Sequence, residues 1–199
     1  EAGVVYISDD RHHDGLILGM SITENLVLRE YRRAPYSRHG LMDRGAMERN
    51  AGEKMAEYQV RASGRSGAGT DVKLLSGGNQ QKLIAARELA DHARLVVASQ
   101  PTRGLDIGAT EFVREQLLRQ REQGKSVVLI SADLEEILAV SDRIAVLFAG
   151  RIAGVLDREE ATVQKLGLLM GGITGEEDVS LQRGTSCSRP LQTPWSSWR

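Results

Sequence analysis

The chain has 199 residues, of which 41% are hydrophobic and 27% are charged, and its formal net charge is -1. This composition is typical of a globular domain with a sizeable core, and a net charge near zero offers no general attraction to nucleic acid. The longest apolar runs, such as VVLI and IAVLFA, fall far short of the roughly 18 residues that indicate a membrane span. No basic and then apolar leader opens the chain, and Cys187 is the only cysteine, so we expect a cytoplasmic protein without a disulfide framework.

The first part of the chain predicts one strand and two helices. GVVYI, residues 3–7, has the short apolar pattern of a strand. Because this strand follows Glu1 almost at once, we expect the chain to begin inside a fold and to be part of a longer protein. Ser21 and Glu24 form an S-x-x-E capping box, which predicts a helix beginning there. A second helix is expected over residues 47–60.

A cluster of arginines lies in and between these two expected helices. Acidic residues are interleaved with the arginines, a pattern that indicates a solvated helical face. Nucleic-acid binding is the alternative, and the interleaved acids and scarce aromatic residues argue against it. The arginines of the cluster are Arg29, Arg32, Arg33, Arg38, Arg44 and Arg49.

Residues 63–70, SGRSGAGT, predict a flexible linker. Within it, Gly64 and Gly69 have the G-x-x-x-x-G spacing of a phosphate-binding P-loop, and Thr70 follows. The lysine of a P-loop is missing, so no side chain would reach the β and γ phosphates of a nucleotide. The pattern G-x-x-x-x-G-K-[ST] occurs nowhere in these 199 residues.

The stretch LSGGNQQK, Leu75 to Lys82, leads directly into a run with helical apolar spacing. Ser76, Gly77 and Gly78 are therefore expected at a helix N-terminus, where unpaired N–H groups and the positive end of the helix dipole favour an anion. Two small glycines would let a phosphate approach the backbone closely. A serine-capped helix that follows a flexible loop is the alternative interpretation.

The rest of the chain alternates strands and helices, which favours an α/β fold with a mostly parallel core sheet. Residues 173–199 have no sustained period and are rich in Ser, Thr and Pro, so they predict a disordered tail. The expected elements are a buried parallel strand over 94–98, a helix over 109–124 that ends at Gly124, a second buried strand over 126–131, a short helix that opens at Asp133 with Glu136 as its capping-box partner, a hairpin that turns at Ala149 and Gly150, and a last helix over 161–172.

LSGGNQQK resembles the signature motif of ATP-binding cassette (ABC) ATPases, and its GNQQK ending resembles the form found in importers of simple sugars and nucleosides. ASQPTRGLD, residues 98–106, is similar to the Walker B end and D-loop of that family. The resemblance covers about residues 3–172. It implies a P-loop NTPase-like α/β cassette over residues 1–172, with a helical subdomain over about 21–90, a small antiparallel edge sheet, and a P-loop upstream of Glu1.

The resemblance also implies which residues contact nucleotide. Two such cassettes face each other head to tail, so the signature of one completes the ATP site of the other, and ATP and Mg²⁺ belong to the assembled pair. Asp9 falls at the Q-loop position, where its carboxylate could reach the magnesium ion or the attacking water, or could be a solvated loop acid. The implied contact residues are Ser76, Gly77, Gly78, Gln80, Asp9 and Asp106.

Three positions that act in hydrolysis in the family hold residues with different chemistry. Ser99 and Gln100 stand where active cassettes have Asp and Glu, and Ala132 stands at the switch histidine. Serine cannot supply the charge that holds Mg²⁺, and glutamine can orient a water but cannot take its proton. We therefore expect no intact catalytic residue and no ATP hydrolysis by this chain alone. His12 and His13 are adjacent and do not predict a metal site.

The implied function is that of an ATP-binding subunit, a second cassette, of an importer for sugars or nucleosides at the cytoplasmic face of the cell membrane. Its implied partners are another cassette, fused upstream, and membrane permease subunits, without nucleic acid. Three alternatives remain: a non-hydrolytic module for dimerisation and permease docking, a soluble ABC protein acting on the ribosome or DNA, and a truncated but competent ATPase. The cassette does not identify the solute, because in this family the permease and an external binding protein select it.

Overall fold

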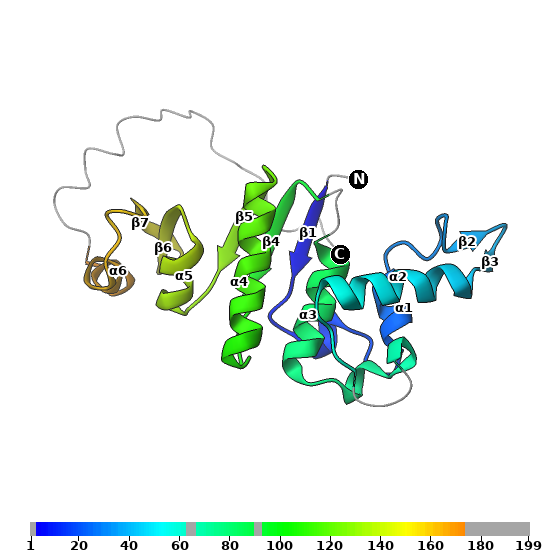
Figure 1. Ribbon diagram of the computed structural model, residues 1–199. Helices are drawn as coiled ribbons and strands as arrows, with labels where there is room; N and C mark the ends of the chain where they lie inside the picture. Colours follow the sequence, from blue (N-terminus) through cyan, green and yellow to red (C-terminus); the bar gives the residue numbers. More distant parts are fainter. Residues whose placement is uncertain (1–2, 63–66, 90–92, 174–199) are drawn as a thin grey trace. The chain divides into compact units, whose positions relative to one another are not determined.

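Three parallel strands, in the order β1 (Val4–Ile7), β4 (Leu95–Ser99) and β5 (Ser126–Ile130), form the central sheet (Figure 1). Val5 pairs with Val96 and Ser99 with Ile130, which confirms the two parallel strands expected at residues 3–7 and 94–98. The computed structural model describes residues 3–62, 67–89 and 93–173. By its internal contacts the chain separates into two units, Glu1–Ser141 and Asp142–Arg199.

Helices make up most of the rest of the first unit. Even α4, with 16 residues, is shorter than the ~20 residues of a bilayer span, and none of the described helices has the length and apolar character to cross a membrane. In chain order this unit contains a π-helical turn η1 (Arg11–Gly15), α1 (Ile22–Val27), a small hairpin of β2 (Ser37–Arg38) and β3 (Leu41–Met42), α2 (Arg44–Glu57), the 3₁₀ turns η2 (Gly67–Gly69) and η3 (Val72–Leu74), α3 (Gly77–Glu88), α4 (Ile107–Glu122) and α5 (Leu134–Val140).

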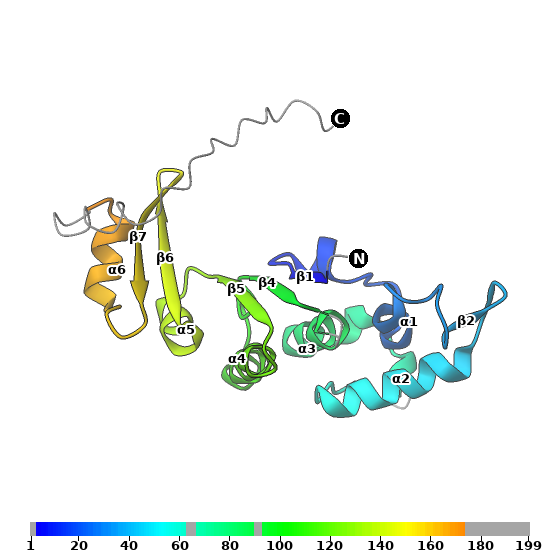
Figure 2. The same cartoon turned by 90° about the horizontal axis from the view of Figure 1, so that it is seen from above.

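Helices pack on only one of the two faces of the central sheet in the described part of the first unit. Helices α3 and α4 lie on one face, as the view from above shows (Figure 2), and Val5, Ile7, Val96 and Ala98 are buried there. No described helix of the first unit covers the other face, where about half of the surface of Tyr6 and Val128 is exposed. The expectation that residues 126–131 form a buried strand is therefore wrong, since β5 is an edge strand with one uncovered face.

Side-chain caps set the starts of α1 and α2. The expected capping box is confirmed, because Glu24 N donates to Ser21 Oγ at 3.2 Å and Ser21 N donates to the Glu24 carboxylate at 2.8 Å. The helix expected over residues 47–60 instead spans Arg44–Glu57. It starts earlier because the Asp43 carboxylate accepts a bond from Ala46 N at 2.9 Å, a cap that the apolar pattern does not reveal.

Asp133 caps α5 as expected, but Glu136 does not complete a capping box. Asp133 Oδ1 accepts from the backbone N–H groups of Glu135 and Glu136 at 2.9 and 3.3 Å. The Glu136 side chain is fully buried, and neither carboxylate oxygen has a hydrogen-bond partner among the described residues. Glu136 is buried, so its side chain is directed away from the helix start. This is an effect of tertiary packing, which the local spacing of Asp133 and Glu136 does not predict.

The described part of the expected linker is packed against α1. Thr23 Oγ1 donates to Ala68 O at 3.0 Å, and Ile22 N donates to Thr70 O at 3.0 Å. Thr70 is buried. Residues 67–70 are therefore packed against α1 rather than forming a flexible linker, while residues 63–66 lie outside the described residues.

The second unit is a hairpin with one helix. Strands β6 (Arg143–Phe148) and β7 (Arg151–Asp157) pair in antiparallel fashion, and α6 (Val163–Met170) packs on them through Leu166 and Leu169. Ala149 and Gly150 both have positive φ, as a tight hairpin turn requires, which confirms the expected edge sheet. The tail predicted over 173–199 lies outside the described residues from residue 174 on, so it remains a prediction.

Glu88, at the end of α3, is a buried carboxylate paired with two arginines. It is 1% exposed, and Arg87 Nε donates to Glu88 Oε1 at 2.8 Å. Arg29 Nη2 lies 2.7 Å from Glu88 Oε2 but without the alignment of a hydrogen bond. Arg87 Nη2 also donates to Gly15 O at 2.6 Å. These contacts attach η1 and the segment after α1 to α3.

Replacing Arg87 should destabilise the chain far more than replacing Arg29. Arg87→Met is expected to lower the free energy of unfolding by about 3 to 5 kcal/mol, because it leaves the Glu88 carboxylate buried without its aligned partner. Arg29→Met is expected to cost about 1 kcal/mol or less, because the Arg29 side chain is 51% exposed and screened by water. Urea unfolding of the chain measures both values, and equal losses would contradict this account of Glu88.

Candidate functional site

Ser76 caps α3, as the sequence predicts. Its Oγ accepts from the backbone N–H of Asn79 at 3.4 Å and from Asn79 Nδ2 at 3.0 Å. Asn79 Oδ1 in turn accepts from the backbone N–H of Arg61 at 2.8 Å, which links the cap to the segment that follows α2. Ser76 is exposed and Gly77 is half-buried, so this helix N-terminus is open to a ligand.

Gly78 lies against the start of α4. A Cβ on Gly78 would stand 2.9 Å from Ala109 Cβ and 3.3 Å from Asp106 Oδ2, closer than real side chains pack. Asp106 caps α4 by accepting from Ala109 N at 2.8 Å, which is why α4 begins two residues before the expected position. The structure thus brings Asp106 beside the signature turn, by which we mean Ser76, Gly77 and Gly78.

The other two implied contact residues, Gln80 and Asp9, are placed differently. Gln80 is 5% exposed, its Nε2 donates to Val72 O at 3.2 Å, and its Oε1 lies 3.1 Å from His12 Nε2. Both ends of this amide are therefore engaged within the chain, beneath the signature turn. Asp9 is exposed after β1 and, in the described part of the chain, forms no hydrogen bond or ion pair with that turn.

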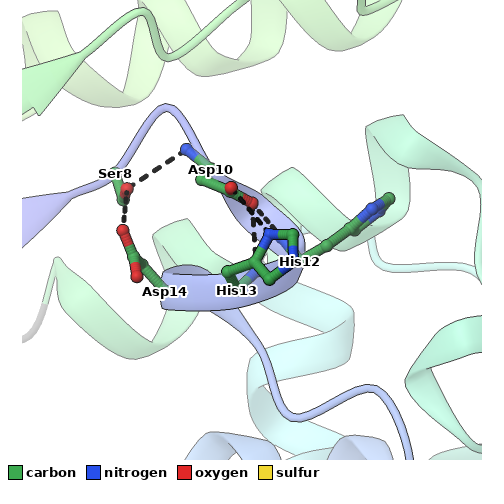
Figure 3. Close-up of polar contacts among 5 residues, drawn as sticks. All are labelled: Ser8, Asp10, His12, His13 and Asp14. Carbon is green, nitrogen blue, oxygen red and sulfur yellow. Dashed lines mark hydrogen bonds and ion pairs between the residues drawn. The ribbon is translucent and has the colours of Figure 1, made fainter.

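The segment after β1 folds into η1, which the sequence did not predict. Asp10 caps it: one carboxylate oxygen accepts from the backbone N–H groups of His12 and His13, both at 3.0 Å, and the other lies 2.8 Å from His13 Nδ1 (Figure 3). The hydrogen bond from the His13 backbone is the main cause that holds the pKa of Asp10 below its usual value. Ser8 completes the turn by accepting from Asp10 N and donating to Asp14.

The two histidines of η1 engage different partners. His13 pairs with Asp10, whereas the His12 ring points away from that pair (Figure 3) and reaches Gln80. Among the residues that the structure describes, no group of three or more His, Cys, Asp or Glu side chains could hold a metal ion.

The three positions that the sequence predicts to differ from an active cassette lie together at the carboxyl ends of the strands. Ser99 ends β4 opposite Ile130, the last residue of β5, and Gln100 N donates to Ile130 O at 2.7 Å. Gln100 has φ 46°, a left-handed conformation that is uncommon outside glycine. Ala132 is exposed just after β5. Adjacent parallel strands therefore present these positions together at their carboxyl ends, where ligands bind in open α/β sheets.

A separate pocket of about 490 Å³ lies between α1, α2 and η2. It has both apolar and charged walls. The residues that line it are Ser21, Thr23 and Glu24 at the start of α1, Met42, Arg44, Met47 and Glu48 in and before α2, and Ala68 and Gly69 of η2.

Solved structures share this arrangement of sheet and helices. A dimeric structure of the ATP-binding cassette MJ0796 in a post-hydrolysis state, bound to ADP and Pi, superposes with a TM-score of 0.60 at 24% identity and covers 78% of this chain and 62% of that chain. A dimeric structure of MJ0796 as a bacterial ABC transporter cassette gives a TM-score of 0.61 at 25% identity, over 77% of this chain and 62% of that chain. The fold is thus that of an ATP-binding cassette.

Comparison with characterised sequences places the chain more closely within that class. The guanosine import ATP-binding protein NupO of Bacillus subtilis is 48% identical over 177 residues, which cover 89% of this chain and 34% of NupO. The nucleoside import ATP-binding protein NupA of Lactococcus lactis is 45% identical over 86% of this chain and 33% of NupA, and the ribose import ATP-binding protein RbsA 2 of Rubrobacter xylanophilus is 38% identical over 88% of this chain and 33% of that protein. The chain is therefore a homologue of the ABC ATP-binding proteins of nucleoside and sugar importers, and it spans about a third of their length. No protein-family model matches it.

Gly77 and Gly78 should respond differently to alanine. Gly78→Ala is expected to cost roughly 1 to 3 kcal/mol of unfolding free energy, because its Cβ would force α3 away from Ala109. Gly77→Ala is expected to be close to neutral, since the nearest atom to its Cβ is the flexible Arg11 Nη1 at 3.4 Å. Urea unfolding measures the two variants, and Ala109→Gly should restore much of the loss in Gly78→Ala. A Gly77→Ala variant as unstable as Gly78→Ala would contradict this packing account.

Proposed function

We propose that this chain is a nucleotide-binding cassette of an importer for nucleosides or sugars, and that its signature turn completes an ATP site whose P-loop belongs to another cassette. The observation that carries the proposal is the open helix N-terminus at Ser76, which stands beside Asp106 in a chain homologous to nucleoside import proteins. Hydrogen bonds to a charged phosphate contribute about 1.5 to 3 kcal/mol each, enough to favour closure of a cassette pair on ATP.

The signature turn fits a phosphate group in two ways. The positive end of the α3 dipole and the N–H groups of its first turn favour an anion. Ser76 and Gly77 carry no bulk that would exclude it, and Ser76 is exposed. Gly78 packs against the start of α4 and so fixes the position of the turn. Mg²⁺ of the pair would be held by the nucleotide phosphates and by the cassette that supplies the P-loop.

This chain contributes binding rather than hydrolysis in the proposal. Ser99, Gln100 and Ala132 stand at the edge where an acid, a general base and a switch histidine would be needed. The loss of a general base alone typically lowers a rate by about 10² to 10⁴. Gln100 keeps the shape of a glutamate and can orient a water molecule, but it cannot accept the proton.

We further propose that the 490 Å³ pocket of the helical subdomain receives a segment of a membrane permease, and that the cassette works at the cytoplasmic face of the membrane. Glu24 and Glu48 supply negative charge and Arg44 positive charge around the methionines Met42 and Met47. Flexible methionines adapt to an apolar partner surface, and the charged rim would orient it.

The first test is solute uptake by cells that carry the variant Ser76→Arg in the full natural protein. An arginine side chain at this cap removes the hydroxyl acceptor and blocks the N-terminus of α3, so uptake of radiolabelled guanosine, ribose or glucose should fall to background. Ser126→Arg is the matched control, because Ser126 is exposed at the start of β5 at the other end of the sheet. If Ser76→Arg cells at normal protein abundance import as the wild type does, the signature turn has no part in an ATP site, and a docking module is the better account.

Purified chain supplied with Mg²⁺ and ATP should release phosphate no faster than a blank. The physical reason is the absence of a carboxylate at positions 99 and 100 and of a P-loop in these residues. A colorimetric phosphate assay measures the rate. Turnover that disappears in the double variant Ser99→Ala, Gln100→Ala would overturn the proposal that this chain contributes binding rather than hydrolysis.

A further inference from the structure

Arg11 lies where three segments of the first unit meet. Its Nη1 donates to the carbonyl oxygen of Gly77 at 3.3 Å. The same nitrogen is 3.4 Å from the position that a Cβ on Gly77 would take, and Nη2 is 3.7 Å from the corresponding position on Gly104. The guanidinium therefore bonds η1 to the signature turn and lies beside the turn that leads into α4.

The rest of η1 is attached along the length of α3. His12 contacts Gln80 at 3.1 Å, and the Gly15 carbonyl accepts from Arg87 at 2.6 Å. A Cβ on Gly15 would stand 2.7 Å from Ile84 Cδ1, so backbone and helix are in close contact there. Asp10 caps the start of η1, directly before Arg11, by accepting from the backbone N–H groups of His12 and His13.

The opposite side of the signature turn is held by the start of α4, where Gly78 approaches Ala109 and Asp106. The two glycines thus face different neighbours: Gly77 faces Arg11, and Gly78 faces α4. Gly104 has φ 68°, a left-handed conformation that glycine adopts without strain, and Arg11 Nη2 lies beside it. The first turn of α3 consequently has η1 on one side and α4 on the other, and Arg11 bonds to Gly77 and lies beside Gly104.

We propose that Arg11 is a positioning residue: it fixes the signature turn against the Gly104 turn, and so sets where the Ser76 cap and Asp106 stand relative to a bound nucleotide. A planar guanidinium has five donors in a fixed fork and can contact two segments at once, whereas a lysine ammonium is a single point of contact. The role in nucleotide binding rests on the proposed function, but the joint itself can be measured without it.

The joint is tested by backbone hydrogen exchange of the full chain, followed by mass spectrometry. Arg11→Ala should raise the exchange rates of residues 76–80 and 103–105 together, by about fivefold or more, because the proposal makes the guanidinium the group that positions both segments. Arg11→Lys should protect one segment at most, and Arg94→Ala, at an exposed arginine before β4, should leave both unchanged. Wild-type exchange in either segment of Arg11→Ala would overturn the proposal. If Arg11→Ala fails to fold, the exchange rates of residues 76–80 and 103–105 are measured in Arg11→Lys instead. Wild-type exchange in both segments of that variant would overturn the proposal.

Uptake by cells separates a failure of this proposal from a failure of the proposed function. Arg11→Ala should lower the maximal uptake rate at least about tenfold and leave the half-saturating solute concentration unchanged, since the solute does not touch this joint. Normal uptake in Arg11→Ala beside abolished uptake in Ser76→Arg would overturn the positioning role alone. Normal uptake in both variants would overturn the proposed function. The hydrogen-exchange result would then show only that Arg11 stabilises the two turns.

Discussion

The contact between the first turn of α3 and the start of α4 is the constraint on which the candidate site depends. Only a glycine at position 78 lets the two helices approach until its Cα faces Ala109, and this approach brings Asp106 next to the signature turn. Burial of Leu83, Ile84 and Phe112 beneath the sheet supplies the driving force that presses these helices together. The site is therefore a product of core packing, and its shape changes with the volume of side chains that never touch a ligand.

Features of the fold that local chemistry determines could be predicted from the sequence. Ser21 with Glu24, Ser76, and the Ala149–Gly150 turn are short-range signals, and the structure confirms the cap, the helix start and the hairpin at those positions. The family resemblance rests on contiguous motifs of the same kind. The homology to importer ATP-binding proteins agrees with it.

Features that depend on distant contacts could not be predicted. Glu136 has the spacing of a capping partner, yet tertiary burial turns its carboxylate away from the helix start. Gln80 belongs to the signature motif, but its amide is held by Val72 and His12 from segments that only the fold brings together. The turn η1 was not predicted for the same reason, because nothing in the local sequence RHHDG indicates that Arg11 bonds to the carbonyl oxygen of Gly77.

The left-handed backbone at Gln100 has a consequence for how such a cassette changes over generations. The conformation is held by the bond from its N–H to Ile130 O and by the end of the sheet, and the side-chain carbonyl or carboxyl group takes no part in it. Glutamine and glutamate have the same shape, and their codons differ at a single position. Either residue therefore fits the backbone conformation at position 100. At this position, a proton-accepting group can be gained or given up in a single genetic step without any rebuilding of the surrounding chain.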